Sequence, residues 1–396
     1  MTDPRFNDQL TRKQLLRRAA VGGTALTLPG LLAACGGGDG IEGAGDTGTA
    51  AAGTTVQQVL ADKLVFANWP LYIDISEDEK SHPSLDQFTQ ETGVAVQYLE
   101  EVNDNEEWFG KYQAQLAQKQ DIGRDITVLT DWMAARMIRL GYAQKKDKSA
   151  IPNEANLVAN LKTPSWDPQR EYSLPWQSGM TGIAYNKKEI GKVTTIDQLL
   201  TDPKLKGKVT CLTEMPDTIG LIMAAQGDDP EKVTAEGFDK AIATLQDAVD
   251  SGQIRRFTGN DYTDDLDAGN VWAAMAWSGD IAAGLKNPNI EWTVVDTKSH
   301  IWTDNMVIPT GGDVFTASTY MNYVYDPKVA AQIAAYVYYI CPVEGAEDQI
   351  AEFDDTAVGN QLIFPSEETR AKTFIFDAEA ADNSDYKEKF AAVIGA

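Results

Sequence analysis

The chain has 396 residues, of which 43% are hydrophobic and 23% are charged, an ordinary composition for a globular protein. Its formal net charge of −25 argues against a nucleic-acid partner, because nucleic-acid phosphates bind to a basic face. The two histidines, His82 and His300, do not have the spacing of a metal site or a Ser-His-Asp site. The sequence therefore favours a protein that is not an enzyme and that carries no cofactor or metal.

The first 34 residues have the pattern of an export signal. An apolar run over 19–34 is shorter than the roughly 20 residues that a membrane span requires. It is preceded by basic residues, which are Arg12, Lys13, Arg17 and Arg18. The stretch from Thr11 to Leu16 approximates a twin-arginine (Tat) signal, and both the Tat and the Sec route stay open.

Cys35 follows Leu32, Ala33 and Ala34, and this segment resembles the lipobox of bacterial lipoproteins. In a lipobox the mature chain begins at the cysteine, whose thiol carries the lipid. We therefore expect an exported protein, periplasmic or at the cell surface, that is anchored to the membrane by a lipidated Cys35. A buried helix with an ordinary cysteine is the alternative. Residues 36–55 are mostly Gly, Ala, Thr and Asp, so we assign 35–62 to the lipidated cysteine and a flexible tether.

Beyond the tether, the hydrophobic pattern alternates between strands and helices. We expect strands near 64–67, 94–98, 125–129 and 208–212, and helices over 84–92, over 238–249 and from Pro327 onward. Roughly 330 residues of this kind predict two domains with α/β layers around mostly parallel sheets. Ligands of such sheets bind where the strands end.

Aromatic and acidic residues gather where these strands are expected to end. The segments are Trp69–Tyr72, Thr130–Trp132, Glu214–Asp217, Trp277–Asp280, Trp302–Asp304 and Tyr339. An aromatic face attracts an alkylammonium group by ~0.5–2 kcal/mol, and a carboxylate offers it a charge-assisted hydrogen bond. Indole rings provide apolar walls for the methylene groups between amines. The pattern therefore predicts a site for a small cationic ligand.

Most of these residues also have a simpler explanation. Trp69, Tyr72, Trp132 and Trp277 could be core residues. Glu214 and Asp217 could favour a helix N-terminus, and Thr130 and Asp304 could belong to turns. His300 could line the cleft, but the simpler expectation is a surface histidine whose hydrogen bonds are satisfied. Cys211 and Cys341 could form a disulfide, although two buried free thiols are the simpler expectation.

The same segments resemble the spermidine/putrescine-binding proteins of ABC importers, over nearly all of 63–396. The matching motifs are Asn68-Trp69-x-x-Tyr72, Thr130-Asp131-Trp132, the acid pair Glu214 and Asp217, Ala276-Trp277-Ser278-Gly279, Trp302-Thr303-Asp304, and Tyr339. The resemblance implies that Glu214 and Asp217 hold one amine and that Asp304 holds another. It also implies that the alkyl chain lies among the aromatic rings, which are those of Trp69, Trp132, Trp277, Trp302 and Tyr339.

The resemblance further implies the two-lobed type II fold of periplasmic binding proteins. Each lobe has a mixed, mostly parallel sheet flanked by helices, and the ligand binds in the cleft between the lobes. We expect lobe 1 to be 64–178 plus 300–346 and lobe 2 to be 179–299 plus 347–396, with crossing strands near 176–181 and 296–302. The implied function is that of a monomeric lipoprotein that captures a polyamine and delivers it to the permease subunits of an ABC importer.

Two departures from the family pattern leave other ligands open. Pro70 and Leu71 stand where the family has a hydroxyl residue and an acid, and no clear counterpart of its C-terminal polar ligand occurs between Phe374 and Asn383. The alternative is a protein of the same fold that binds another small solute, such as an amino acid, an opine-like compound or a sugar. A secreted enzyme is a further, less supported alternative.

Overall fold

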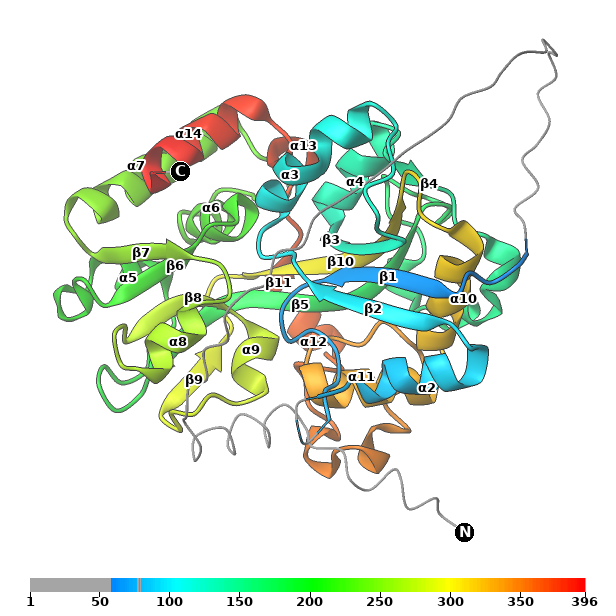
Figure 1. Cartoon of the computed structure of the whole chain (residues 1–396). Coiled ribbons are helices and arrows are strands. Elements are labelled where there is room, and N and C mark those ends of the chain that lie inside the picture. Colours follow the sequence, from blue (N-terminus) through cyan, green and yellow to red (C-terminus); the bar gives the residue numbers. More distant parts are fainter. Residues whose placement is uncertain (1–57, 77, 79, 396) are drawn as a thin grey trace, which may run out of the picture.

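The structure is a computed structural model that describes residues 58–76, 78 and 80–395 (Figure 1). The predicted signal sequence, Cys35 and most of the predicted tether lie outside the described residues. Within the described part, none of the helices combines the length and the apolar character that crossing a bilayer requires.

One continuous sheet runs through the molecule in the strand order β2-β1-β3-β10-β5-β8-β6-β7. The strands are β1 (Lys63–Asn68), β2 (Ala95–Glu100), β3 (Ile126–Thr130), β4 (Ala143–Gln144), β5 (Ser173–Asn186), β6 (Val209–Leu212), β7 (Ile254–Thr258), β8 (Ala273–Trp277), β9 (Ile290–Thr293), β10 (Ser299–Pro309) and β11 (Thr373–Phe374). Strand β1 is parallel to β2 and β3, and β6 is parallel to β7 and β8. The predicted α/β organisation with mostly parallel neighbours is therefore confirmed at both ends of the sheet.

Helices cover the sheet on both of its sides (Figure 1). They are α2 (Pro83–Thr92), α3 (Asn105–Ala117), α4 (Asp131–Arg139), α5 (Ile196–Thr201), α6 (Met215–Ala225), α7 (Ala235–Asp250), α8 (Tyr262–Asp267), α9 (Ser278–Ala282), α10 (Val314–Val324), α11 (Pro327–Val337), α12 (Glu367–Arg370), α13 (Ala378–Ala381) and α14 (Ser384–Ile394). Short 3-10 turns lie at Lys148–Ala150, Pro152–Asn156, Ala159–Leu161, Pro203–Leu205, Ile350–Glu352 and Asp355–Ala357.

The expected elements form for local reasons. Strand β1 is buried from Leu64 to Asn68 because helices cover both faces of its parallel sheet. Helix α2 begins with Pro83, whose missing N–H costs nothing at that position, and ends at Gly93, whose φ of 80° closes the helix. Helix α11 begins in the same way at Pro327, and the Asp326 carboxylate accepts a hydrogen bond from its first turn.

Two long antiparallel strands, β5 and β10, run through the middle of the sheet and join its two ends. They pair from His300 opposite Thr181 to Val307 opposite Ser173, with an irregularity between Asp304 and Asn305. Strand β10 also pairs with β3, and β5 with β8, so each parallel group is attached to one of the two crossing strands. The division into lobes at 178/179, 299/300 and 346/347 stays a prediction.

Cys211 and Cys341 are both buried and free, as the simpler expectation had it. Burial raises the pKa of each thiol to about 12, because the charged thiolate is poorly solvated there. Neither thiol therefore has the lowered pKa of a reactive cysteine.

Candidate functional site

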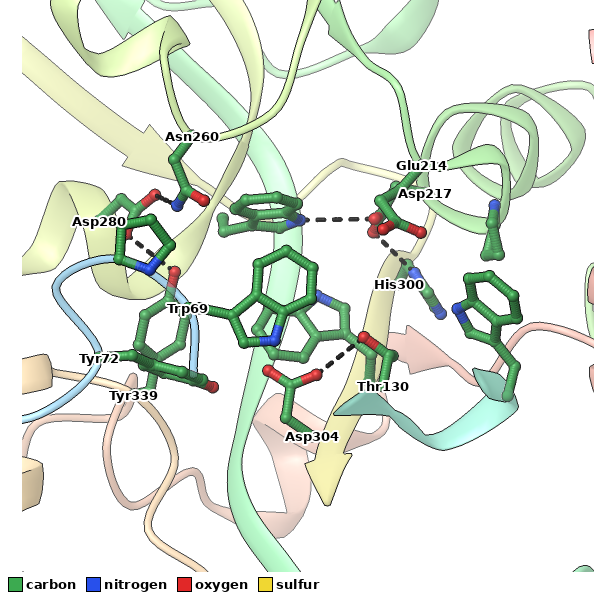
Figure 2. Close-up of a pocket in the computed structure, with 15 residues that line it drawn as sticks. Trp69, Tyr72, Thr130, Glu214, Asp217, Asn260, Asp280, His300, Asp304 and Tyr339 are labelled. Atoms are coloured by element: carbon green, nitrogen blue, oxygen red, sulfur yellow. Dashed lines mark hydrogen bonds and ion pairs between the residues drawn. The ribbon is translucent and has the colours of Figure 1, made fainter. Parts of the chain in front are cut away.

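All ten predicted ligand-binding residues line one cavity (Figure 2). They are Trp69, Tyr72, Thr130, Trp132, Glu214, Asp217, Trp277, Trp302, Asp304 and Tyr339. Five further residues line the cavity but were not predicted to bind the ligand, and they are Pro70, Pro216, Asn260, Asp280 and His300. The free volume of the cavity is about 30 Å³, room for roughly two water molecules. A larger ligand can enter only if the walls move.

Most of these side chains lie where strands end, as the strand pattern predicts. Trp69 follows β1, Thr130 ends β3, and Trp277 ends β8. Glu214 follows β6 and directly precedes α6. Asp217 stands in the first turn of α6, and Asp280 in the first turn of α9. The cavity is therefore a convergence of several strand ends, which is the expected place for a ligand in an α/β sheet.

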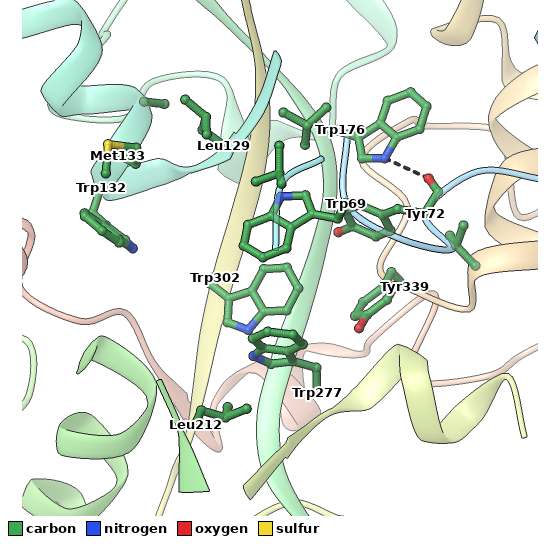
Figure 3. Packing of buried hydrophobic residues seen from close by; sticks show 14 of the residues in the cluster. Trp69, Tyr72, Leu129, Trp132, Met133, Trp176, Leu212, Trp277, Trp302 and Tyr339 are labelled. Atoms are coloured by element: carbon green, nitrogen blue, oxygen red, sulfur yellow. Dashed lines mark hydrogen bonds between the residues drawn. The ribbon is translucent and has the colours of Figure 1, made fainter. Parts of the chain in front are cut away.

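A chain of buried aromatic rings forms the cavity wall (Figure 3). The ring of Trp277 lies edge-to-face against Trp69, with centroids 6.1 Å apart, and against Trp302, with centroids 6.3 Å apart. Tyr339 continues the chain at 5.6 Å from Trp302 and 5.0 Å from Tyr72. In an edge-to-face pair the edge of one ring meets one face of the other, so the opposite face of that second ring is not used by the contact.

Two glycines make room for this wall. A Cβ atom on Gly179 would lie 2.4 Å from the indole of Trp302, and one on Gly279 would lie 2.4 Å from the ring of Tyr339. Both distances are far inside van der Waals contact, so any larger residue would displace these rings.

Trp132 stands apart from the other rings (Figure 3). It lines the cavity, but its indole also stacks on the guanidinium of Arg136, whose Cζ is 5.1 Å from the ring centroid. A cation already occupies this ring, so Trp132 is less available for an ammonium group than the other indoles.

Asp304 is the least satisfied acid of the cavity. Its side chain is 3% exposed, and among the described residues its hydrogen-bond partner is Thr130, whose Oγ1 donates to Asp304 Oδ1 over 2.8 Å. Burial raises the pKa of Asp304 to about 7. Burial and the nearby Asp304, with which the Tyr72 hydroxyl interacts directly, also raise the pKa of Tyr72. A cation placed here would complete this end of the cavity.

Asp217 is already surrounded by donors. His300 Nδ1 lies 2.8 Å from Asp217 Oδ1, the Thr181 hydroxyl donates to the same oxygen, and Trp277 Nε1 donates to Oδ2 over 3.4 Å. Because an ionised carboxylate can only accept, Nδ1 of His300 carries the proton. His300 is 4% exposed and stacks on Phe374, so the expectation of a surface histidine was wrong.

Glu214 belongs to a second polar network. The backbone N–H and the side-chain amide of Asn105 both donate to Glu214 Oε1 over 3.0 Å. The same amide also donates to Thr130 Oγ1 over 2.9 Å. Burial raises the pKa of Glu214 well above its ordinary value, and neighbouring Asp104 raises it further. Glu214 is therefore linked through Asn105 and Thr130 to Asp304.

Asp280 is a cavity acid that was absent from the predicted set. The hydroxyl of Tyr262 and the amide of Asn260 donate to its Oδ2 over 2.7 and 2.9 Å, and the Tyr339 hydroxyl donates to its Oδ1 over 3.0 Å. The sequence contains a signal for Asp280, because this acid lies three residues after Trp277, at the end of a buried strand. Asn260 follows β7 (IRRFT), whose two arginines obscure the strand pattern.

The residues that depart from the family pattern lie at the cavity edge. Pro70 lines the cavity, whereas Leu71 does not, and Leu71 is partly exposed with a φ of 55°. The backbone N–H of Leu71 donates to Glu100 Oε1 over 2.7 Å. No side chain from this stretch therefore adds a charge to the cavity.

The lining of the cavity is rich in acidic side chains. Among the described residues, the lining contains the acids Glu214, Asp217, Asp280 and Asp304, together with His300 and no lysine or arginine. No group of three or more His, Cys, Asp or Glu residues in the described part is arranged to hold a metal ion. The geometry suits an organic cation with an apolar stem.

Comparisons with known proteins show the family of this chain. The profile of a family described as "Bacterial extracellular solute-binding protein" matches residues 84–358. The chain is 26% identical over 329 residues to the putrescine-binding periplasmic protein PotF of Escherichia coli, covering 78% of this chain and 84% of that protein. It is also 26% identical over 294 residues to a putrescine/cadaverine-binding protein of Pseudomonas aeruginosa, covering 70% and 78% of the two chains.

Two solved structures have the same architecture. A putative spermidine/putrescine ABC transporter protein from Listeria monocytogenes superposes with a TM-score of 0.72 at 24% identity, covering 84% of this chain and 99% of that one. The Tp0655 lipoprotein of Treponema pallidum superposes with a TM-score of 0.70 at 21% identity, covering 85% and 100% of the two chains. The solved neighbours are type II periplasmic binding proteins, which confirms the predicted fold class.

Proposed function

This chain belongs to the family of bacterial extracellular solute-binding proteins, and we propose that it captures a polyamine of the putrescine or spermidine type outside the cytoplasmic membrane. The observation that carries the proposal is the buried acid Asp304, beside the hydroxyls of Thr130 and Tyr72 and with no cationic partner among the residues that line this aromatic-walled cavity in the described chain. The names of the relatives, which bind putrescine, cadaverine or spermidine, support the same ligand class.

The ligand would bind in an extended conformation. One ammonium group would lie at Asp304, where a charge-assisted hydrogen bond offsets the cost of removing it from water. The methylene groups would lie against the indoles of Trp69, Trp277 and Trp302, and the aromatic faces would attract the ammonium ends. The other acids, Glu214, Asp217 and Asp280, make the rest of the cavity favourable for further positive charge.

Binding would close the two lobes. With boundaries at 178/179, 299/300 and 346/347, the cavity residues come from both lobes, and contacts such as Asn105 with Glu214 cross between them. The small free volume supports a closed state around a ligand that enters when the lobes separate. A ligand that contacts both lobes prefers the closed form, and this differential affinity drives closure.

Delivery to an ABC permease completes the proposal. The closed, loaded protein would dock on the permease subunits as a monomer and release the polyamine there. Cys35 would carry the lipid anchor, and residues 35–62 would give the protein reach above the membrane. The protein would act by binding alone, without catalysis.

A ligand screen by thermal shift tests this function. Putrescine, cadaverine, spermidine and spermine are compared with amino acids and sugars at equal concentration. We expect at least one polyamine to raise the melting temperature, because a ligand that binds only the folded state stabilises it by mass action. Stabilisation by an amino acid or a sugar, without any effect of the polyamines, would contradict the proposal.

A further inference from the structure

Among the described residues, the lining of the cavity contains one basic side chain, that of His300. Strand β10 places His300, Trp302 and Asp304 at alternate positions, so the three side chains share one face of the sheet. On this face, the side chain of Trp302 forms part of the aromatic wall, and the carboxylate of Asp304 lines the cavity. His300 uses it to reach Asp217 Oδ1 over 2.8 Å, a distance typical of a charge-assisted hydrogen bond.

The surroundings of His300 hold it in this place. Its ring stacks on Phe374 with an interplanar angle of 16° and meets Phe376 nearly at a right angle. The ionisable groups facing it come from other elements: Asp217 from α6 and Asp131 from the start of α4. Glu214, at the start of α6, also interacts electrostatically with Asp217. His300 therefore lies in an acidic setting with no competing base among the lining residues of the described chain.

The two ends of the cavity consequently differ. Asp304 has only hydroxyl neighbours, Thr130 and Tyr72, whereas Asp217 takes donors from His300, Thr181 and Trp277. The two acids lie on different sides of the labelled Trp69 ring in Figure 2. An ammonium group can bind Asp304 without displacing a protein donor, but a second ammonium at Asp217 meets an imidazole that is already there.

We propose that His300 is a specificity-determining residue that controls whether the cavity accepts a second ammonium group at Asp217. The proposal rests on the proposed function, because it concerns the number of charges on the bound amine. When protonated, His300 neutralises Asp217 and repels a second ammonium. When neutral, it still donates from Nδ1, but the negative charge of Asp217 becomes available to the ligand.

The sign of the pH dependence follows from these charges. Diamines stay doubly charged below about pH 9, since an alkylamine titrates near the lysine pKa of ~10.4. Over the pH range in which histidine changes charge, loss of the imidazole proton increases the affinity for the second ammonium of a diamine and has no counterpart for a monoamine. Titration of Asp304 and Asp131 changes both affinities together. The ratio of the two affinities therefore removes the dependence that both amines share, and a variant of His300 separates its effect from that of Glu214, whose raised pKa also concerns the Asp217 end.

Calorimetric titration with two probes of equal carbon number tests the proposal. Putrescine carries two ammonium groups and butylamine carries one, and each is titrated between about pH 5.5 and 8.5, the range in which histidine changes charge. The variant is His300→Asn, whose amide nitrogen can replace Nδ1 as a donor. The matched control is His82→Asn, which alters a histidine whose Nδ1 contacts the carbonyl oxygen of Asp74 outside the cavity.

We expect the ratio of putrescine affinity to butylamine affinity to rise about tenfold with pH in the wild type and in His82→Asn. In His300→Asn the ratio should stay constant within about twofold. An equal rise of the ratio in His300→Asn would overturn the proposal. Absence of binding by both amines at every pH would instead remove the polyamine function, and the proposal with it.

A spectroscopic measurement on an unaltered cavity gives an independent test. The chain has two histidines, so an untagged sample of His82→Asn shows the ring protons of His300 alone by NMR. Saturating putrescine should move the ring-proton chemical shifts of His300 near neutral pH toward those of the neutral imidazole, because a second ammonium disfavours the protonated ring, and butylamine should move them far less. Equal shifts with the two amines would show that His300 does not respond to the second charge, and would overturn the proposal.

Discussion

Thr130 and Asp304 face each other across neighbouring antiparallel strands, and Thr130 Oγ1 donates to Asp304 Oδ1 over 2.8 Å. The backbone register of β3 and β10 therefore fixes the position of the acid that the ligand would use. The threonine satisfies one oxygen and leaves the rest of the carboxylate available. A preorganised acid of this kind gives affinity without the cost of ordering a mobile side chain.

Replacing Asp304 with asparagine should weaken polyamine binding. The substitution keeps the shape and removes the charge, so it should cost ~1–3 kcal/mol of binding free energy, the scale of a hydrogen bond to a charged group. Isothermal titration with the best polyamine measures the change. Asp385→Asn is the control, because Asp385 is an exposed acid on α14. Unchanged affinity in Asp304→Asn would remove Asp304 from the site.

The same substitution should stabilise the unliganded protein. Burial raises the pKa of Asp304 to about 7 in the folded state, above its value in the unfolded chain. The folded protein therefore holds the proton more tightly, and stability falls as pH rises from about 4 to 7. At pH 8 we expect Asp304→Asn to raise the free energy of unfolding by ~1–3 kcal/mol. Chemical denaturation at pH 4 and pH 8 checks this; an equal effect at both pH values would be inconsistent with the raised pKa.

The raised pKa of Asp304 also predicts a pH-dependent affinity for a monoamine. Below about pH 7 the carboxyl is increasingly neutral and cannot pair with an ammonium group. Butylamine affinity should therefore rise as pH increases from 6 to 8 and level off above that, by roughly tenfold per pH unit at most. In Asp304→Asn the dependence should disappear. A flat profile in the wild type would mean that Asp304 is ionised throughout or lies away from the amine.

Gly279 should be required for the aromatic wall. A methyl group at Gly279 would lie 2.4 Å from the Tyr339 ring, so Gly279→Ala should displace Tyr339 and weaken polyamine binding by ~1–3 kcal/mol, the usual scale of overpacking. Gly110→Ala is the control. Its new Cβ would meet nothing within 4 Å in α3, so it should stabilise the helix slightly and leave binding unchanged. If Gly279→Ala binds the polyamine with wild-type affinity, the position of Tyr339 does not contribute to binding.

An ionic cluster should hold the proposed lobes together. Asp382, between α13 and α14, pairs with Arg136 and Arg139 of α4, and Lys387 of α14 pairs with Glu106 of α3. With the predicted boundaries these pairs cross from lobe 2 to lobe 1. Asp382→Asn should destabilise the closed form by ~1–2 kcal/mol, since Arg136 keeps its second partner, Glu106.

Small-angle X-ray scattering checks this closure contact. Unliganded Asp382→Asn should have a larger radius of gyration than the wild type, and saturating polyamine should reduce the difference. Asp228→Asn is the control, because Asp228 pairs with Lys240 inside the expected lobe 2. Identical radii for Asp382→Asn and the wild type would mean that the cluster does not bias closure.

Much of the fold could be predicted because its signals are local. The apolar run of β1, the proline starts of α2 and α11 and the positive φ of Gly93 act within a few residues. The long crossing strands were harder to predict, because β5 is buried at every position and lacks the alternation of a half-buried strand. The order of the strands depends on contacts between distant segments and not on local pattern.

Several cavity residues could be identified because they end or directly follow buried strands, whereas Trp302 and Asp304 lie inside β10. The prediction of a surface position for His300 was wrong, although the pattern of the same strand indicates a position in the cavity. Residues 300, 302 and 304 alternate, so assigning Trp302 and Asp304 to the cavity also assigns His300. The hydrogen bonds that satisfy Asp217 and leave Asp304 open come from Thr181, Trp277 and Thr130, which lie on three different strands. No sequence pattern fixes those distances.

The most direct test of the account is a crystal structure of the protein grown with putrescine or spermidine. We predict an amine nitrogen within hydrogen-bond distance, about 3 Å, of a carboxylate oxygen of Asp304, with the alkyl chain between the indoles of Trp69, Trp277 and Trp302. A polyamine bound outside this cavity, or inside it with Asp304 facing only water, would contradict the account.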